Sequence, residues 1–220
     1  SGDSVSANVA YCPWLDDVYP DGELTSDGGL VTNLDTGEVF CSIQAAIDDD
    51  DTTDGHTIAV SAGTYNESIL FDAGLDKDNL TISGDASDRP VVTGGVRFLN
   101  IATLDGLTFE NLYLKGVAPA GDGVFDMDNS GVVNDLTLDN CVIDGENVSG
   151  RNGLLGQNLA HDFTIVNTEF KNILGWAVMD LNSGSGDGGN TQPLNIVTFA
   201  HNHVHECNGS VALRGNAEHK

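Results

Sequence analysis

The feature that most constrains this chain is a short repeated stretch of sequence. Leu107-Thr-Phe-Glu-Asn111 recurs as an apolar residue, Thr, an apolar residue, a variable residue and then Asn. The first copy ends in Gly84 and the last in His201 instead of Asn. Repeats of this length are typical of solenoids, in which each repeat packs on its neighbours. The copies begin 27, 29, 27 and 34 residues apart, at Leu80, Leu107, Leu136, Phe163 and Val197.

Each copy has the alternation of a short strand, with Leu107 and Phe109 facing inward and Thr108 outward. The Asn that follows tolerates left-handed backbone and can bond the main chain at a turn. Stacked coils would therefore align Asn111, Asn140 and Asn167 as a ladder in the bend. Helical repeats are the alternative, but the Gly, Asn and β-branched content disfavours them. A second apolar segment closes each coil: Val124–Met127, Leu154–Gln157, Val178–Leu181 and Val211–Arg214. These features predict an all-β fold, a parallel β-helix.

Composition limits the partners of the chain. Its 220 residues suit one domain, and its formal net charge is −26 with only 8 Lys and Arg residues. Such a surface repels nucleic acid and anionic membranes and favours cations or basic partners. Adaptation to high salt (a halophilic source) and a calcium-rich extracellular setting both fit this acidity. No apolar run is long enough to cross a membrane as a helix, so we expect no membrane insertion.

The N-terminal part does not match the repeat. We expect residues 1–41 to cover the first edge of the solenoid and residues 42–220 to form the β-helix. Ser42 can cap a short helix in which Ile43 and Ile47 share one face. Cys12 and Cys41 bracket the edge cover, and we predict a disulfide between them.

Four motifs near the start resemble the opening of the pectin-lyase-like superfamily of right-handed parallel β-helices. They are Ser42-Ile-Gln-Ala-Ala-Ile-Asp48, Gly55-His-Thr-Ile58, Ala62-Gly-Thr-Tyr-Asn-Glu67 and Leu80-Thr-Ile-Ser-Gly-Asp85. Pectin methylesterases, alginate and chondroitin lyases and many surface proteins share this opening. The resemblance implies a single-stranded right-handed parallel β-helix with a short N-terminal capping helix. It implies no particular activity.

Aligning the repeats gathers charged side chains on one outward face. Glu169, Lys171, His203 and His205 should share a patch on adjacent coils. In a polysaccharide lyase, β-elimination needs a base for the C5 proton and a cation for the uronate carboxylate. Lys171 or His203 could be the base, and Arg214 could bind the uronate carboxylate. The alginate and chondroitin lyases that the chain resembles use a Lys and Arg pair, and Lys171 loosely matches that Lys. Substrate would then be bound by Glu169, His205 and Lys115.

A mixed solvated face is the simpler interpretation of the same residues, because stacked charge is normal on solenoid surfaces. We favour it over the lyase.

Two stretches suggest metal binding. His201-Asn-His-Val-His205 offers two converging histidines at best, because His201 occupies the corner place, and a zinc site needs three or four ligands. Asp126, Asp128 and Ser130 resemble the first half of a calcium loop, but Thr137 replaces the Glu expected at its twelfth position. Ca²⁺ is therefore a candidate cofactor, with a solvated turn as the alternative.

Esterase activity fits the sequence less well. Gly63-Thr-Tyr-Asn-Glu67 matches the first pectin methylesterase motif, but Ser210 stands where that family has a catalytic Gln. We therefore expect a non-catalytic, extracellular or cell-surface module of a larger protein, either structural or binding a polysaccharide or cell-surface glycan. A lyase acting on an acidic glycan is the alternative. A homo-oligomer formed through an uncapped C-terminal coil is a further hypothesis.

Overall fold

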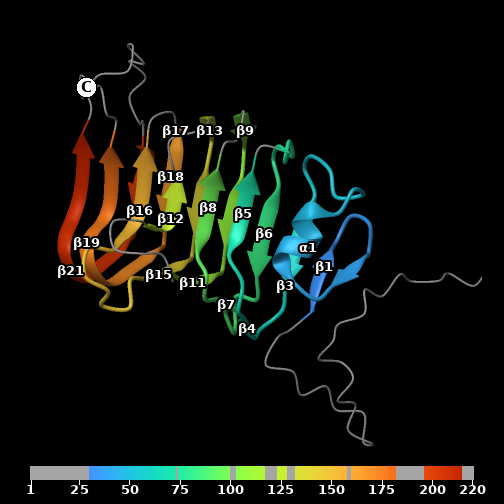
Figure 1. Cartoon of the computed structure of the whole chain (residues 1–220), viewed down its shortest axis with the longest axis horizontal. Coiled ribbons are helices and arrows are strands. Elements are labelled where there is room, and N and C mark those ends of the chain that lie inside the picture. The colour runs from blue at the N-terminus through green and yellow to red at the C-terminus, as the bar shows by residue number, and fades with distance from the viewer. Residues whose placement is uncertain are drawn as a thin grey trace, which may run out of the picture.

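Strands from successive repeats stack in register along one axis and form a parallel β-solenoid (Figure 1). The computed structural model describes residues 30–72, 74–99, 103–116, 123–127, 132–157, 160–181 and 196–214. Inward positions are buried and outward positions are partly exposed along most strands, as in the buried–intermediate alternation of β3 (Thr57–Val60). The predicted parallel β-helix is confirmed.

The repeated motif forms the first sheet, sheet A. Its parallel strands pair so that Thr81, Thr108, Thr137, Thr164 and Thr198 lie in line on successive coils. The predicted stacking of the motif is therefore confirmed from its Thr position onward, but Phe163 pairs with Ile196 instead of Val197, because the register shifts between Phe163 and Thr164. In spatial order the sheet contains β2 (Val39–Phe40), β1 (Val31–Asn33), β3, β6 (Thr81–Gly84), β10 (Thr108–Glu110), β14 (Thr137–Asp139), β18 (Phe163–Val166) and β20 (Ile196–Ala200).

Sheet B contains two rows of short strands that the longer strand β19 joins. One row is β4 (Thr64–Tyr65), β7 (Val91–Val92), β11 (Tyr113–Lys115) and β15 (Val142–Asp144). The other is β5 (Ile69–Asp72), β8 (Val96–Leu99), β12 (Gly123–Met127) and β16 (Asn152–Gln157). Both rows end on β19 (Glu169–Leu181), which β21 (His203–Arg214) follows in parallel. The four predicted closing segments all lie in strands of this sheet.

A third, small sheet was not predicted. Sheet C contains β9 (Thr103–Asp105), β13 (Val132–Asn134) and β17 (Ala160–His161), which pair in parallel. The aligned positions of these strands hold a different residue in each coil, unlike the Thr positions of sheet A, so the repeat gives no signal for them.

The corner between sheets A and B requires left-handed backbone. Asn111, Asn140, Asn167 and His201 have φ values of 58°, 52°, 53° and 58°. The Asn140 side-chain amide donates to the side-chain oxygen Oδ1 of Asn111 at 2.7 Å. Asn167 instead donates to the carboxylate of Asp139 at 2.8 Å. The predicted corner is confirmed for the backbone, but the continuous side-chain ladder is wrong beyond Asn140, because a neighbouring carboxylate is the stronger acceptor.

Aromatic side chains stack along the core. Phe71 and Phe98 are parallel with ring centroids 4.9 Å apart, and Phe109 meets Phe125 edge-on at 5.1 Å. All four are at most 1% exposed. Because they come from sheets A and B of different coils, they tie the coils together as well as filling the interior.

Helix α1 (Ile43–Asp48) closes the N-terminal end, as predicted, and both of its ends are tied to the solenoid. The Ser42 hydroxyl accepts the amide proton of Ala45 at 3.1 Å. Glu67 accepts the amide protons of Ile43 and Gln44, each at 2.9 Å. At the other end Lys77 donates to the carbonyl oxygens of Ile47 and Asp49, each at 2.6 Å, where a cation satisfies free carbonyl groups.

The described part of the N-terminal segment joins sheet A. β1 pairs antiparallel with both β2 and β3 and so covers the first edge of the parallel stack. Residues 1–29, the larger part of the predicted edge cover, lie outside the described residues. Cys41 is disulfide-bonded, and Cys12, its predicted partner, also lies outside them. Cys141 and Cys207 are free thiols.

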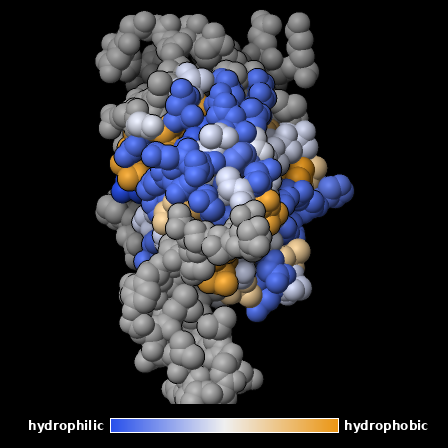
Figure 2. Space-filling model, turned by 90° about the vertical axis from the view of Figure 1, so that its right-hand side faces the viewer, coloured by the Kyte–Doolittle hydropathy of each residue, from blue (hydrophilic) through white to orange (hydrophobic). Residues whose placement is uncertain are grey.

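The surface at this end is strongly hydrophilic (Figure 2). A hollow there is lined by several carboxylates, among them Asp48, Asp54 and Asp76. Within the described residues, no helix has the length and apolar character needed to cross a bilayer.

Candidate functional site

The candidate site lies on the outer face of sheet B, across β11, β15, β19 and β21. Strand pairing aligns two neighbouring columns of outward side chains on these four strands. The columns that the repeat predicts are therefore confirmed. They are Tyr113, Val142, Glu169 and His203, and Lys115, Asp144, Lys171 and His205.

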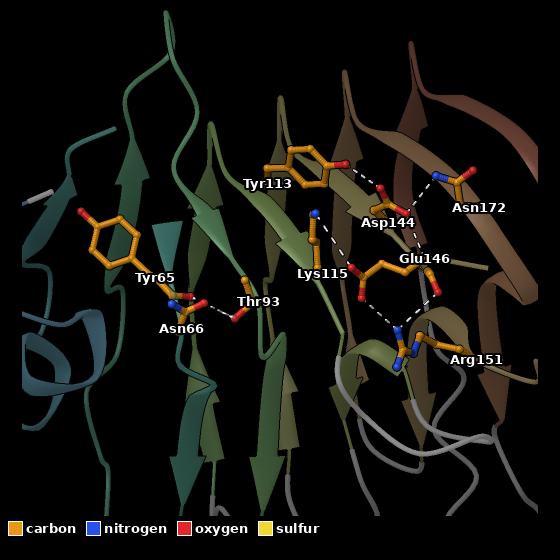
Figure 3. Close-up of polar contacts among 10 residues, drawn as sticks. Tyr65, Asn66, Thr93, Tyr113, Lys115, Asp144, Glu146, Arg151 and Asn172 are labelled. Carbon is orange, nitrogen blue, oxygen red and sulfur yellow. Dashed lines mark hydrogen bonds and ion pairs between the residues drawn. The ribbon is translucent and has the colours of Figure 1, made fainter. Parts of the chain in front are cut away.

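Asp144 is the centre of the hydrogen-bonded part of the site (Figure 3). Its carboxylate accepts the Tyr113 hydroxyl proton at 2.5 Å and a proton of the Asn172 amide at 3.0 Å. It also accepts the backbone amide proton of Glu146 at 2.8 Å. Asp144 is only 5% exposed, so a buried charge is satisfied by three donors from three coils.

Two lysine ammonium groups lie over the Tyr113 ring, and each has a carboxylate nearby. The ammonium groups of Lys171 and Lys115 lie 4.9 and 5.4 Å from the ring centroid, within the range of a cation–π contact. Lys115 is 3.9 Å from Glu146, and Lys171 is 3.7 Å from Glu169. Arg151, which is nearly buried, completes the group at 3.4 Å from Glu146.

Next to this network, Glu169 meets two histidines from the following coil. Glu169 and His203 are direct cross-strand partners, and His205 is two residues further along β21. The Glu169 carboxylate lies 2.8 Å from His205 Nε2. The two imidazole rings stack with centroids 4.4 Å apart and planes 25° apart. The three residues therefore form one compact cluster.

These contacts shift the pKa values of three groups. Burial, followed by the hydrogen bond to Asp144, raises the pKa of the Tyr113 hydroxyl above its ordinary value. Burial alone would raise the pKa of Asp144, but the hydrogen bonds from Tyr113, Glu146 and Asn172 together lower it. The hydrogen bond from His205 is the main cause that lowers the pKa of Glu169, and the Lys171 charge adds to it. The site thus holds fixed carboxylates and a protonated phenol at neutral pH.

The other predicted site residues lie elsewhere. Arg214 pairs with Leu181 at the far end of β21, whereas His205 pairs with Lys171 near its start. The structure therefore does not bring the backbone of Arg214 next to Lys171 and His203. Asp126 is 2% exposed and lies 3.9 Å from the Arg97 guanidinium. Asp128 and Ser130, which complete the predicted calcium loop, lie outside the described residues.

Three contributors to the site were missed by sequence reasoning. Asn172 has φ of 55°, and this left-handed residue inside β19 turns the strand so that Ile173 points into the core. The sequence did contain a signal for this turn, because Asn172 directly follows the alternating stretch Glu169–Lys171. Glu146 and Arg151 come from the connection between β15 and β16. The connection between β11 and β12 has the same length but other residues at the equivalent positions, Val117 and Asp122, so the repeat gave no signal for Glu146 and Arg151.

Comparison with known proteins gives one relative. In an alignment of 91 positions that covers 37% of the chain, the sequence is 34% identical to a protein from Methanothermus fervidus named "Cell surface glycoprotein". The matched stretch covers 15% of the length of that protein. No protein-family model matches the chain. No solved structure matches it either.

Proposed function

We propose that this chain is a non-catalytic module of an extracellular or cell-surface protein, and that its solenoid presents the outer face of sheet B to polysaccharide. Similarity to a short part of a protein named "Cell surface glycoprotein" supports a surface location. The net charge of −26 supports a setting rich in cations and argues against anionic polymers such as nucleic acid as partners.

One observation carries the non-catalytic part of the proposal: the charged groups of the site pair with one another. Lys115 faces Glu146, Lys171 faces Glu169, and Asp144 is satisfied by Tyr113 and Asn172. A catalytic site for β-elimination aims its base and its carboxylate clamp at a common reacting atom. A face of mutually satisfied polar groups suits the binding of hydroxyl-rich ligands better than proton abstraction.

Aromatic side chains support the binding of sugars. Tyr113 is a half-buried aromatic residue on the outer face of sheet B, and Trp176, further along β19, is 38% exposed. Tyr and Trp combine a large apolar surface with a polar atom, which suits contact with the apolar faces and hydroxyl groups of sugars.

A polysaccharide lyase remains the second candidate, because Lys171, His203 and His205 do lie on adjacent strands. This activity would need a carboxylate clamp other than Arg214 on that face, or a bound cation that bridges the protein and an acidic glycan. Ca²⁺ is the cation that the sequence suggests for this role.

A binding assay tests the proposal. The full chain is applied to arrayed neutral and acidic polysaccharides with and without Ca²⁺, beside the variants Tyr113→Ala and Leu34→Ala. Leu34 is a matched control, since it is an exposed apolar residue (61%) outside sheet B. We expect binding that Tyr113→Ala weakens and Leu34→Ala does not. Binding that neither variant weakens would remove the proposed face.

The same samples test for catalysis. Elimination on alginate, pectate or chondroitin creates an unsaturated uronate that absorbs in the ultraviolet. Absorbance that increases with protein concentration and is lost in Lys171→Met would contradict the non-catalytic proposal. No increase on these substrates would remove the lyase for them.

A further inference from the structure

Glu169, His203 and His205 form a three-residue cluster, the Glu–His–His cluster, to which the proposed binding of polysaccharide assigns no ligand. Their ligand atoms all lie within 4.8 Å of one another. Among His, Cys, Asp and Glu side chains in the described part of the chain, the other such group, Glu38, Asp49 and Asp51, contains carboxylates alone. The Glu–His–His cluster differs from it by offering two imidazole nitrogens.

The backbone fixes the directions of the three side chains. His203 and His205 are two residues apart on β21, so both point to the outer face of sheet B. Glu169 on β19 is the direct cross-strand partner of His203. Three donors on two adjacent hydrogen-bonded strands have little backbone freedom to lose when an ion binds, because the sheet already holds them.

The distances require only side-chain rotation. Zinc bonds of about 2.0–2.1 Å place tetrahedral ligand atoms about 3.3 Å apart. His205 Nε2 and Glu169 Oε1 are already 2.8 Å apart. His203 is exposed and its ligand atom lies within 4.8 Å of the other two, so rotation of its ring by at most about 1.5 Å brings all three atoms to the spacing of a zinc site.

Neighbouring charges orient the ligands. Lys171 lies 3.7 Å from Glu169 Oε2, the oxygen that does not contact His205. The Glu206 carboxylate lies 3.6 Å from His205 Nδ1, the ring nitrogen away from Glu169. A carboxylate beside the second nitrogen of a metal-binding histidine is a common arrangement, because it fixes the ring and increases the basicity of the coordinating nitrogen.

We propose that Glu169, His203 and His205 bind one divalent transition-metal ion of the zinc class. Two imidazoles and one carboxylate are a known ligand set for Zn²⁺ and leave a coordination position for water or a ligand oxygen. Imidazole nitrogens favour such ions over Ca²⁺ and Mg²⁺, which prefer oxygen. The excess negative charge of the chain adds long-range attraction for any cation.

Cobalt provides the direct test, because tetrahedral Co²⁺ with nitrogen and oxygen ligands has visible absorption bands. The full chain is titrated with CoCl₂ in buffered salt with excess Ca²⁺, which occupies the general carboxylate sites. Zn²⁺ is then added to displace the cobalt. The variants are Glu169→Gln, His203→Ala and His205→Ala. The matched control is His201→Asn, because Asn occupies the same left-handed corner in three other coils.

We expect one equivalent of Co²⁺, displaced by Zn²⁺ and not by Ca²⁺. Each ligand variant should weaken binding at least about tenfold, the size of effect seen even for residues behind the ligands. His201→Asn should leave the affinity unchanged. Circular dichroism should show an intact fold in all variants, because the side chains point outward. Equal weakening by His201→Asn, or no visible bands in the unaltered chain, would overturn the proposal.

Discussion

Replacing Phe109 by Ala tests the stacked core, because the loss of stability can be compared with that of a matched substitution at a more exposed Phe. Phe109 is completely buried and contacts the rings of Phe71 and Phe125. A buried Phe removes about 150–250 Å² from water, and at about 25 cal/mol per Å² this corresponds to roughly 4–6 kcal/mol. Measured Phe→Ala costs in protein cores are about 3–5 kcal/mol. We therefore expect Phe109→Ala to lower the free energy of unfolding by about 4 kcal/mol.

Phe199 is the control, since it occupies the same column of sheet A three coils later. It is 39% exposed, so Phe199→Ala removes less buried area and leaves no closed cavity. We expect a cost of about 2 kcal/mol for it. Unfolding of both variants in guanidinium chloride is monitored by circular dichroism. The dependence of the free energy of unfolding on denaturant concentration is compared between them, because a smaller slope would indicate loss of cooperativity. A cost for Phe109→Ala that is no larger than that for Phe199→Ala would refute the stacked core.

Three further outcomes follow from particular residues. Asn140→Ala should lower the free energy of unfolding by about 1–2 kcal/mol, because Ala is strained at φ 52°; Asn140→Gly should cost less, and equal costs in thermal unfolding would contradict this. Asp144→Asn should cost about 1 kcal/mol at neutral pH. The pKa of Asp144 is lower in the folded chain, so its charge contributes to the free energy of unfolding above the unfolded pKa of about 3.9, and this contribution is lost as pH falls through the folded pKa. A stability difference between Asp144→Asn and the unaltered chain that persists at still lower pH would contradict this linkage. Burial raises the pKa of Cys141 to about 12, so a thiol reagent followed by peptide mass analysis should label Cys207 in the native protein and Cys141 only after unfolding; early labelling of Cys141 would show that its coil is open.

The repeat was sufficient to predict sheet A and the columns of the candidate site. In a solenoid, one coil fixes the register of the next, so alignment of the copies also aligns Glu169 with His203 and Lys171 with His205. The capping helix was predictable because Ser42 and the spacing of Ile43 and Ile47 are local signals.

Other features depend on contacts that have no repeated signal. Sheet C consists of strands with no residue in common at their aligned positions. The contact of Arg151 with Glu146 arises within a connection whose residues do not repeat in the equivalent connection between β11 and β12. Asn167 bonds Asp139 because a carboxylate lies within reach, which only the folded geometry reveals. The sequence placed Glu169, His203 and His205 in one patch but offered only the two histidines as metal ligands, and the distances among the three ligand atoms come from the folded geometry.

The distance across the stack tests the central claim most directly. Thr81 and Thr198 lie at the same outward position, four coils apart, in a column of in-line threonines that begins at Thr57. Spin labels can be placed there as Thr81→Cys and Thr198→Cys, with Cys141 and Cys207 replaced by Ser. At a strand spacing of about 4.8 Å, four coil-to-coil steps predict a backbone separation of about 19 Å and a narrow distance distribution by pulsed electron paramagnetic resonance. A broad distribution, or a separation of about twice that value, would contradict the stacked solenoid and the outer face built on it.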